Sequence, residues 1–443
     1  MMKQLIGNGV LITRNREKAL IKDGCVVVDG NVIIDYGTTA TMKEKYTEYA
    51  FDDVHGKLIM PGLINTHGHI YSALARGMIL NDSKVSKNFT EILENLWWRV
   101  DRALDLDEIK YCAYTTYIDG IKNGVTTVFD HHASAGRVRG SLMTIADVAK
   151  ELGVRTSLCY EVSDRDGQVI ADEGIKENSE FIKYANQQNS DMIKGMFGLH
   201  ASFTISQDTL EKCVENAGDT GFHVHVAEGI DDQKDSVEKY GKRVVERLYD
   251  SRILKNNTIA VHCIHIDDNE MSLLKESDSI VVHNPESNMG NAVGCSRALE
   301  MMDKGILMGL GTDGFTTDMF ESLKVANILH KHQLGDPSVA WMEAPQMLFD
   351  NNKEICSRFF DGNVGVIEKD ALADIIVVDY QSPTPITENN INSHMLFGLM
   401  GRNVVTTIIN GQYAMKNRVI QTVDEEKIYT DSQQCAKAFW KRV

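Results

Sequence analysis

The chain has 443 residues, of which 43% are hydrophobic and 25% are charged, a composition typical of a globular protein. Its formal net charge of −17 excludes the basic surface that attracts nucleic acids and anionic membranes. We therefore expect a small molecule as its partner, with no nucleic acid and no membrane. No apolar stretch reaches the ~20 residues that span a bilayer, and the N-terminus lacks the apolar region of a secretory signal. These patterns, and 8 irregularly spaced Cys without a CxxC pair, predict a cytoplasmic protein with reduced thiols.

Short strands and turns are predicted for residues 1–57. Two β-branched runs between residues 25 and 37 flank Asp29-Gly30-Asn31, which is typical of a hairpin turn. From residue 58 the pattern changes, and apolar runs begin to alternate with longer amphipathic stretches. The chain therefore passes into a second structural region at about residue 58.

Eight apolar runs follow one another between residues 58 and 361. They are apolar throughout rather than alternating, as expected for parallel strands buried on both faces. The runs are Ile59–His69, Val125–His132, Arg155–Glu161, Met196–Ser202, Phe222–Glu228, Thr258–His265, Ile280–Glu286 and Ile306–Asp313. The segments between them include the helical patterns Thr90–Tyr117, Ser141–Leu152 and Val237–Tyr249. Eight strand–helix units predict an α/β fold, a (β/α)₈ TIM barrel over residues 58–361.

The β pattern returns after residue 362. Residues 373–379 form an apolar run, and Asn410-Gly411 marks a second hairpin turn. Residues 425–443 have the pattern of a C-terminal helix. We expect residues 1–57 and 362–424 to pair into one composite β-sandwich domain beside the barrel.

Polar residues stand at the ends of runs one, five and eight in a pattern that predicts a metal site. His67 and His69 project to the same face of a strand, because strand side chains alternate with period two. A barrel gathers the carboxyl ends of its strands into one ring, which would bring His225 and Asp313 to the same place. Three imidazoles and a carboxylate suit one divalent ion, zinc or alternatively iron(II). Such an ion lowers the pKa of bound water to about 7.

Each of these motifs also has a structural interpretation. A single His-X-His is more often a surface pair, and His225 is ambiguous because His223 forms a His-X-His with it. The joint pattern over several strand ends is the specific signal, and we interpret His223 as a packing or orienting residue.

Three residues beside the predicted metal are candidates for proton transfer. Glu228, three residues after His225, is placed to take a proton from water and deliver it to a ring nitrogen or a leaving amine. His262, at the end of run six, would polarise the metal-bound water. Asp313, besides binding the metal, would accept the proton of that water. We therefore predict Glu228, His262 and Asp313 as the catalytic residues.

These motifs resemble those of the metal-dependent amidohydrolase superfamily, in the mononuclear branch that holds deaminases and chlorohydrolases. The resemblance lies in Pro61–His69, in His225-Val-Ala-Glu228 and in Gly311-Thr-Asp313-Gly314. More narrowly the chain is similar to SsnA-type aminohydrolases in the segments Leu96–Leu104, Asp130–Ser134, Val282–Asn288 and Gln381–Pro385. The resemblance implies the same ligands and catalytic roles, and a homo-oligomer. The chain departs from the family pattern at Asp370, where the family usually has a glycine in a turn.

The resemblance implies further site residues. His200, at the end of run four, matches a histidine that contacts substrate, and no lysine ends that run to bridge a second metal. One metal is therefore expected. The remaining predicted substrate-binding residues, which also have structural interpretations, are Arg76, Trp97, His131, His132 and His283.

We predict hydrolytic deamination of a purine- or pyrimidine-like nitrogen heterocycle. The alternative within enzymes is dechlorination or hydrolysis of a cyclic amide by the same site. A non-catalytic binding protein on the same barrel would have lost part of the machinery, and none of these residues is missing.

Overall fold

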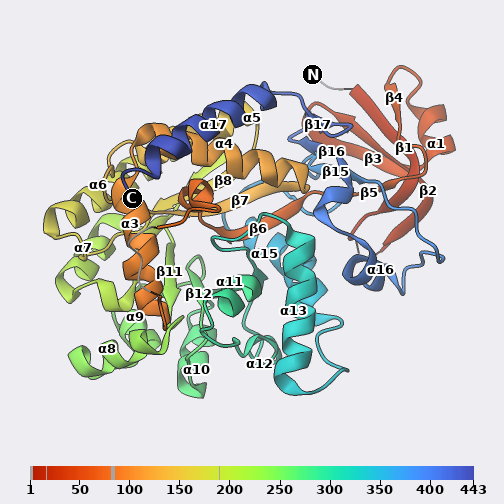
Figure 1. Cartoon of the computed structure of the whole chain (residues 1–443). Coiled ribbons are helices and arrows are strands. Elements are labelled where there is room, and N and C mark those ends of the chain that lie inside the picture. The colour runs from red at the N-terminus through yellow and green to blue at the C-terminus, as the bar shows by residue number, and fades with distance from the viewer. Residues whose placement is uncertain (1–2, 16, 81–84, 189) are drawn as a thin grey trace.

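A computed structural model describes residues 3–15, 17–80, 85–188 and 190–443. The fold is mixed α/β, with two parallel sheets covered by helices and a third sheet built from both ends of the chain (Figure 1). Within these ranges no helix has both the length and the apolar character to cross a membrane. All eight Cys are free, and six of them are buried.

The two parallel sheets contain the predicted apolar runs. The first has the order β6 (Leu63–Gly68), β7 (Val125–His132), β8 (Arg155–Tyr160) and β9 (Ile193–Gly195). The second has the order β10 (Phe197–Ala201), β11 (Phe222–Val226), β12 (Ile259–His262), β13 (Ile280–His283) and β14 (Met308–Leu310). Nearly every residue of these strands is buried, as the continuous apolar runs predicted.

Two isolated bridges connect the parallel sheets at their edges. Gly68, at the end of β6, pairs with Asp313 beyond β14, and Val162 beyond β8 pairs with Leu199 of β10. The first of these bridges places the last predicted ligand directly beside the His67–His69 segment. The topology thus brings residues almost 250 positions apart in sequence to one strand end.

Helices follow most of the parallel strands. They include α4 (Leu106–Lys122), α5 (Ser141–Leu152), α6 (Gln168–Gln187), α7 (Gln207–Ala217), α8 (Ile230–Tyr240), α9 (Val244–Asp250), α10 (Asp268–Glu276), α11 (Pro285–Gly290), α12 (Ala298–Asp303), α13 (Met319–Leu334), α14 (Glu343–Pro345) and α15 (Asn352–Ser357). The predicted helix Ser141–Leu152 is confirmed as α5.

Two predicted helices are each broken in the structure. The stretch Thr90–Tyr117 falls into α2 (Phe89–Ile92), a π-helical turn η2 (Leu93–Trp97), α3 (Trp98–Ala103) and α4. The break precedes Asp105, whose carboxylate caps α4 in a capping box with Glu108. The stretch Val237–Tyr249 breaks at Gly241, where a left-handed residue ends α8.

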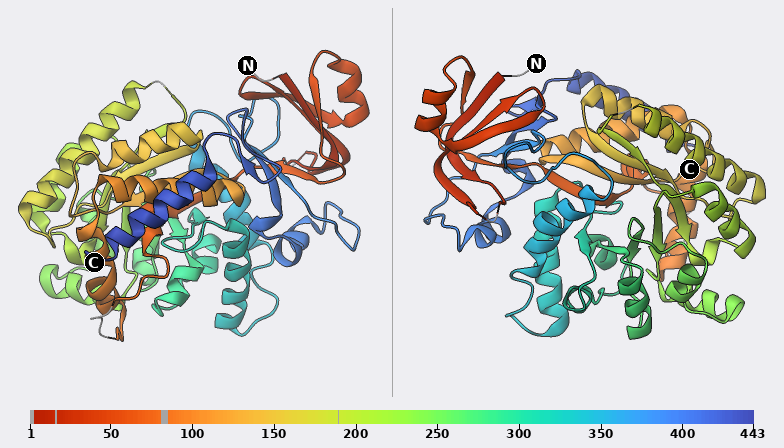
Figure 2. Two further views of the ribbon diagram at one scale, coloured as in Figure 1. Left: turned by 45° about the horizontal axis from the view of Figure 1, so that its top comes forward. Right: turned by 180° about the vertical axis from the view of Figure 1, so that it is seen from behind.

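Strands from both termini pair into one nine-stranded sheet, visible as the adjacent red and blue strands of Figure 2. Its order is β18-β17-β16-β15-β5-β1-β2-β3, with β4 paired to β1. The strands are β1 (Lys3–Ile12), β2 (Leu20–Asp29), β3 (Val32–Thr38), β4 (Ala50–Asp53), β5 (Leu58–Pro61), β15 (Ile375–Val378), β16 (Val404–Ile409), β17 (Gln412–Lys416) and β18 (Val419–Ile420). Both predicted hairpins are present, as β2–β3 and β16–β17. Short helices α1 (Thr39–Lys45) and α16 (Ile391–Gly398) accompany this sheet.

The predicted run Ile59–His69 is two strands rather than one. Its first part, β5, pairs with β1 and β15 of the terminal sheet, and its second part, β6, pairs with β7. The change of partner occurs at Pro61-Gly62, because Pro61 has no N–H to donate, and the Gly62 N–H reaches the Asp374 carbonyl at 2.9 Å. Asp370 has φ +68°, so an aspartate holds the left-handed turn where glycine was expected.

A buried ion pair ties the terminal sheet to the parallel strands. Arg155 at the start of β8 and Asp374 beside β15 are both buried, and Arg155 donates from Nε and Nη2 to the two carboxylate oxygens at 3.3 and 3.1 Å. Asp374 also accepts from the Asn410 N–H at 2.7 Å. The predicted C-terminal helix is α17 (Glu425–Phe439), which lies along α4 (Figure 2).

Candidate metal centre and active site

His67 and His69, at the end of β6, are each held by a contact on the ring nitrogen Nδ1. The His67 Nδ1 lies 2.9 Å from Nε2 of His223, and the His69 Nδ1 donates to the His131 carbonyl at 2.6 Å. Both rings therefore turn their Nε2 atoms inward. The Nε2 of His67 is buried and has no hydrogen-bond partner among the described residues. An outer hydrogen bond on one nitrogen is how proteins orient an imidazole that binds metal through the other.

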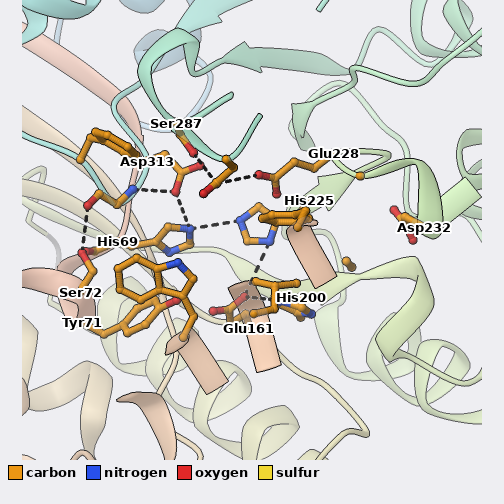
Figure 3. Close-up of a pocket in the computed structure, with 18 of the residues that line it drawn as sticks. His69, Tyr71, Ser72, Glu161, His200, His225, Glu228, Asp232, Ser287 and Asp313 are labelled. Atoms are coloured by element: carbon orange, nitrogen blue, oxygen red, sulfur yellow. Dashed lines mark hydrogen bonds and ion pairs between the residues drawn. The ribbon is translucent and has the colours of Figure 1, made fainter. Parts of the chain in front are cut away.

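His225 and Asp313 complete the predicted ligand set. The Nε2 of His69 lies 3.2 Å from Nε2 of His225 and 3.2 Å from Oδ1 of Asp313. Figure 3 shows these three side chains converging from separate strands. Gly311 permits the approach of the last strand, because a Cβ there would lie 2.8 Å from the His67 carbonyl oxygen. The structure thus brings all four predicted ligands into one cluster.

The chemistry of this cluster fits a divalent metal ion. One ligand atom from each of His67, His69 and His225 lies within 4.8 Å of the others, and His67, His262 and Asp313 form an overlapping group. Burial, followed by the neighbouring imidazoles, holds the pKa values of His67 and His225 well below the usual range. These imidazoles are therefore neutral at pH 7, which is the form that binds zinc or iron(II).

Glu228 and His262 stand beside the ligands. The Oε2 of Glu228 lies 3.3 Å from Nε2 of His262, which lies 3.4 Å from Oδ2 of Asp313. The Nδ1 of His262 donates to Oδ1 of Asn288 at 2.8 Å, which fixes the orientation of the ring. Burial, and then the charge of Asp313, raises the pKa of Glu228 well above the usual carboxyl range. Glu228 can therefore hold a proton near neutral pH and release it to a reacting group.

These groups open into a partly enclosed cavity, whose space of about 700 Å³ between protein atoms includes solvent at the mouth. Its polar wall includes His69, His225, Asp313 and Glu228. Its apolar wall is formed by Phe89, Leu93, Trp97, Phe203 and Phe315. The combination of a few convergent polar groups with an aromatic wall is typical of a site for a planar small molecule.

The structure brings three of the six predicted substrate-binding residues to this region. His200 and Trp97 line the cavity, and the His200 Nδ1 contacts Oγ1 of Thr204 at 2.7 Å. His131 lies under the ligands, with Nδ1 3.4 Å from Nε2 of His225, and stacks on His223 with ring centres 4.6 Å apart.

The other three predicted substrate-binding residues do not line the cavity. Arg76 is exposed and paired with Asp119 at 2.9 Å. His132 follows His131 on β7, so its ring points the other way, and its Nε2 contacts Ser134 at 3.0 Å. His283 is buried against the ring of His330, with centres 5.0 Å apart.

Glu161 is a site residue that the sequence reasoning missed. It follows β8 directly, is buried, and has Oε2 3.8 Å from Nδ1 of His225 and 3.9 Å from Nε2 of His200. The signal was available, because Glu161 ends a predicted apolar run as His225 and Asp313 do. The aromatic wall, by contrast, comes mainly from loops and short helices and had no periodic signal.

A cluster of candidate metal ligands at the ends of parallel strands, with an acid beside it, is typical of a metal-dependent hydrolase. Residues 58–414 match the model described as "Amidohydrolase family". The chain belongs to this family, and it is a hydrolase that acts on C–N bonds.

Curated relatives match over nearly the whole chain. A 5-methylthioadenosine/S-adenosylhomocysteine deaminase of Thermococcus sibiricus is 33% identical, over 94% of this chain and 94% of its own. A 5'-deoxyadenosine deaminase of Methanopyrus kandleri is 30% identical, over 98% of this chain and 99% of its own.

Solved structures share the fold. An adenosine deaminase from Xanthomonas campestris with bound zinc superimposes with a TM-score of 0.87 at 22% identity, over 100% of this chain and 99% of that chain. The atrazine chlorohydrolase TrzN from Arthrobacter aurescens, complexed with zinc, gives a TM-score of 0.81 at 20% identity, over 98% and 100%.

Proposed function

We propose that the protein is a metal-dependent aminohydrolase that deaminates the purine ring of an adenosine derivative. The observation that carries this proposal is the position of Glu228, which lines one cavity together with the metal cluster and the aromatic wall. The deaminase names of the curated relatives support the same activity.

The residues divide the chemistry among them. The metal, when bound, supplies a Lewis acid that makes water nucleophilic at neutral pH. Glu228 passes a proton to a ring nitrogen of the substrate, which prepares the amine-bearing carbon for attack. His262 and Asp313 take the proton that the water loses and return it to the amine, which leaves as ammonia when the C–N bond breaks. The proton of the added hydroxyl group returns to Glu228 as the carbonyl forms. Trp97 and Phe203 enclose the planar ring and exclude bulk water from the proton transfers.

Several finer assignments accompany this proposal. We propose zinc as the metal, with iron(II) as the alternative, and one ion per site. We propose that the two parallel sheets form one (β/α)₈ barrel over residues 58–361. Residues 1–57 and 362–424 would make the composite β domain, and residues 425–443 the C-terminal helix.

Release of ammonia from a substrate panel tests the proposed activity. The panel contains adenosine, 5'-deoxyadenosine, 5'-methylthioadenosine, guanine, cytosine, a chlorotriazine and a cyclic urea. We expect ammonia from at least one adenosine derivative. Chloride release or ring opening without any ammonia would instead establish the alternative chemistry.

The variant Glu228→Gln tests the role of the acid. It should keep the metal and lose activity by about 10²–10⁴-fold, the usual contribution of a general acid–base group. The control is Glu180→Gln, which removes the same charge from an exposed side chain on α6 and should retain activity. Full activity of Glu228→Gln with bound metal would remove Glu228 from the mechanism.

A further inference from the structure

We infer that Tyr71 recognises the substrate ring: its hydroxyl donates a hydrogen bond to the ring nitrogen on the far side of the reacting carbon from Glu228, which is N7 of an adenine ring. This inference rests on the proposed deaminase function. Tyr71 was not among the substrate-binding residues that the sequence predicted.

Tyr71 is the second residue after the predicted ligand His69, and its backbone is held in place. It lies in the short helix η1 (Ile70–Ala75), whose first N–H donates to Oδ1 of Asp130 at 2.7 Å. The Tyr71 carbonyl accepts from Sγ of Cys112 at 3.4 Å. The Tyr71 ring packs edge-on against the His69 ring, with centres 5.3 Å apart. The side chain therefore has a fixed position directly beside the metal cluster.

The Tyr71 hydroxyl faces the cavity without a partner. Tyr71 is 8% exposed and lines the cavity, and its hydroxyl makes no hydrogen bond with any described residue. The hydroxyl is not sealed in the interior either, so the space in front of it is the cavity. A neutral phenol can donate one hydrogen bond. A polar group that is almost wholly removed from water gains most from a ligand that supplies the missing partner.

The position of Tyr71 relative to Glu228 decides which edge of the ring it meets. In Figure 3, Tyr71 and Glu228 lie on opposite sides of the His69 ring. In adenine, the amine-bearing carbon has a ring nitrogen on one side and, on the other, the carbon that leads to N7. A ring whose first nitrogen meets Glu228 therefore turns N7 toward Tyr71. N7 of adenine is a hydrogen-bond acceptor, so it needs a donor there.

His200, on the same side of the cluster as Tyr71, is an acceptor rather than a donor. The Thr204 hydroxyl donates to the Ala201 carbonyl at 3.0 Å, so it accepts the hydrogen bond from Nδ1 of His200 at 2.7 Å. A neutral imidazole with its proton on Nδ1 presents Nε2 as an acceptor. Glu161 turns Oε2 toward three imidazoles, whose nitrogens lie 3.8–3.9 Å away. An acceptor nitrogen of the substrate therefore finds its donor in Tyr71.

The indole N–H of Trp97 is a second uncharged donor on the cavity wall, and it also has no partner among the described residues. The Trp97 ring packs edge-on against Tyr71, with centres 6.3 Å apart, and Tyr71 in turn packs against His69. Of the two donors, Tyr71 is therefore the one whose ring contacts a predicted ligand, beside the carbon that reacts. Replacing each residue in turn separates their contributions.

A substrate that lacks N7 tests the inference. The probe is the 7-deaza analogue of an adenosine derivative from which the wild-type protein releases ammonia, and it carries a C–H group in place of N7. For Tyr71→Phe we expect kcat/KM to fall about tenfold with the N7 substrate and less than about twofold with the 7-deaza analogue. The measured quantity is the change in the ratio between the two substrates, because the two rings differ in intrinsic reactivity.

Tyr117→Phe is the matched control. Tyr117 on α4 is buried, its hydroxyl donates to Oγ1 of Thr156 at 3.0 Å, and it does not line the cavity. This variant should leave the ratio between the two substrates unchanged. The metal content of Tyr71→Phe is measured in parallel, because Tyr71 packs against His69, and it should equal that of the wild type.

The contrary outcomes are distinct. An equal loss with both substrates, with or without loss of metal, would show a structural role for the hydroxyl and overturn the inference, while the deaminase proposal stands. No loss with either substrate would overturn it as well. So would a preference for the N7 substrate that is lost in Trp97→Phe and kept in Tyr71→Phe. If no adenosine derivative releases ammonia from the wild type, the proposed function fails and the inference fails with it.

Discussion

Replacing His223 with phenylalanine should weaken metal binding without touching a ligand. His223 is buried, contacts Nδ1 of His67 through its Nε2 at 2.9 Å, and stacks on His131. The orientation of the His67 ring toward the metal depends on this contact, because a proton on Nδ1 leaves Nε2 free to bind the ion. Phenylalanine preserves the stacked ring and removes the hydrogen bond.

The expected magnitude follows from two estimates. Leaving a buried donor without a partner costs about 1–3 kcal/mol. Loss of an outer partner of a metal-binding imidazole lowers metal affinity by about 10–100-fold, which is about 1.4–2.7 kcal/mol at 1.4 kcal/mol per tenfold. The two ranges agree, so His223→Phe should raise the metal Kd by about 10–100-fold.

The assay is competition with a chromogenic chelator, with the metal content of the purified protein measured alongside. His132→Phe is the matched control, because His132 is equally buried but contacts Ser134 rather than a predicted ligand. An unchanged Kd in His223→Phe, or an equal loss in His132→Phe, would refute the reasoning.

Three further predictions follow from the structure. Asp374→Asn should lower the free energy of unfolding by about 3–5 kcal/mol in urea titrations, because it removes the nearer of the two carboxylates paired with the buried Arg155, the other being Asp191 at 3.8 Å; a loss below about 1 kcal/mol would contradict this. Burial raises the pKa of Glu286 to about 8 in the folded protein, whereas a glutamate in the unfolded chain has a pKa of about 4.3. Between these two pH values the folded protein keeps a proton that the unfolded chain has released. Stability should therefore fall as pH rises from about 5 to 8, and Tm should fall less over this range in Glu286→Gln than in the wild type. The same decrease of Tm with pH in both proteins would count against this prediction. Chelation should lower Tm and added zinc should restore it, since a ligand at 100 times its Kd stabilises by about 2.7 kcal/mol; an insensitive Tm would speak against a metal site.

Much of the metal site was predictable because it obeys a rule of position. His67, His69, His225 and Asp313 each end an apolar run, and parallel strands end at a common edge. The period of two in a strand further placed His67 and His69 on one face. The family match then agrees with the motifs that those residues carry.

The substrate side was less predictable, for a geometric reason. His131 and His132 are adjacent on β7, and the sequence could not say which of them faces the ligands, because the phase of a strand depends on its pairing. Glu161 had the same signal as the ligands, but its role depends on which side chains reach the same cavity. The strand pattern also could not reveal that Pro61-Gly62 divides the first run between two sheets.

The sequence by itself indicated the class of fold, the family and the candidate metal ligands, because burial and strand period are local properties of the chain. Only the tertiary structure decided which acids and rings share one cavity with that cluster. It placed Glu161 beside His200 and His225, left Arg76 at the surface with Asp119, and lined the cavity with the acids Glu161, Glu228, Asp232 and Asp313. The physical reason is that charge balance and side-chain direction in a cavity arise from segments far apart in sequence, which no local pattern records.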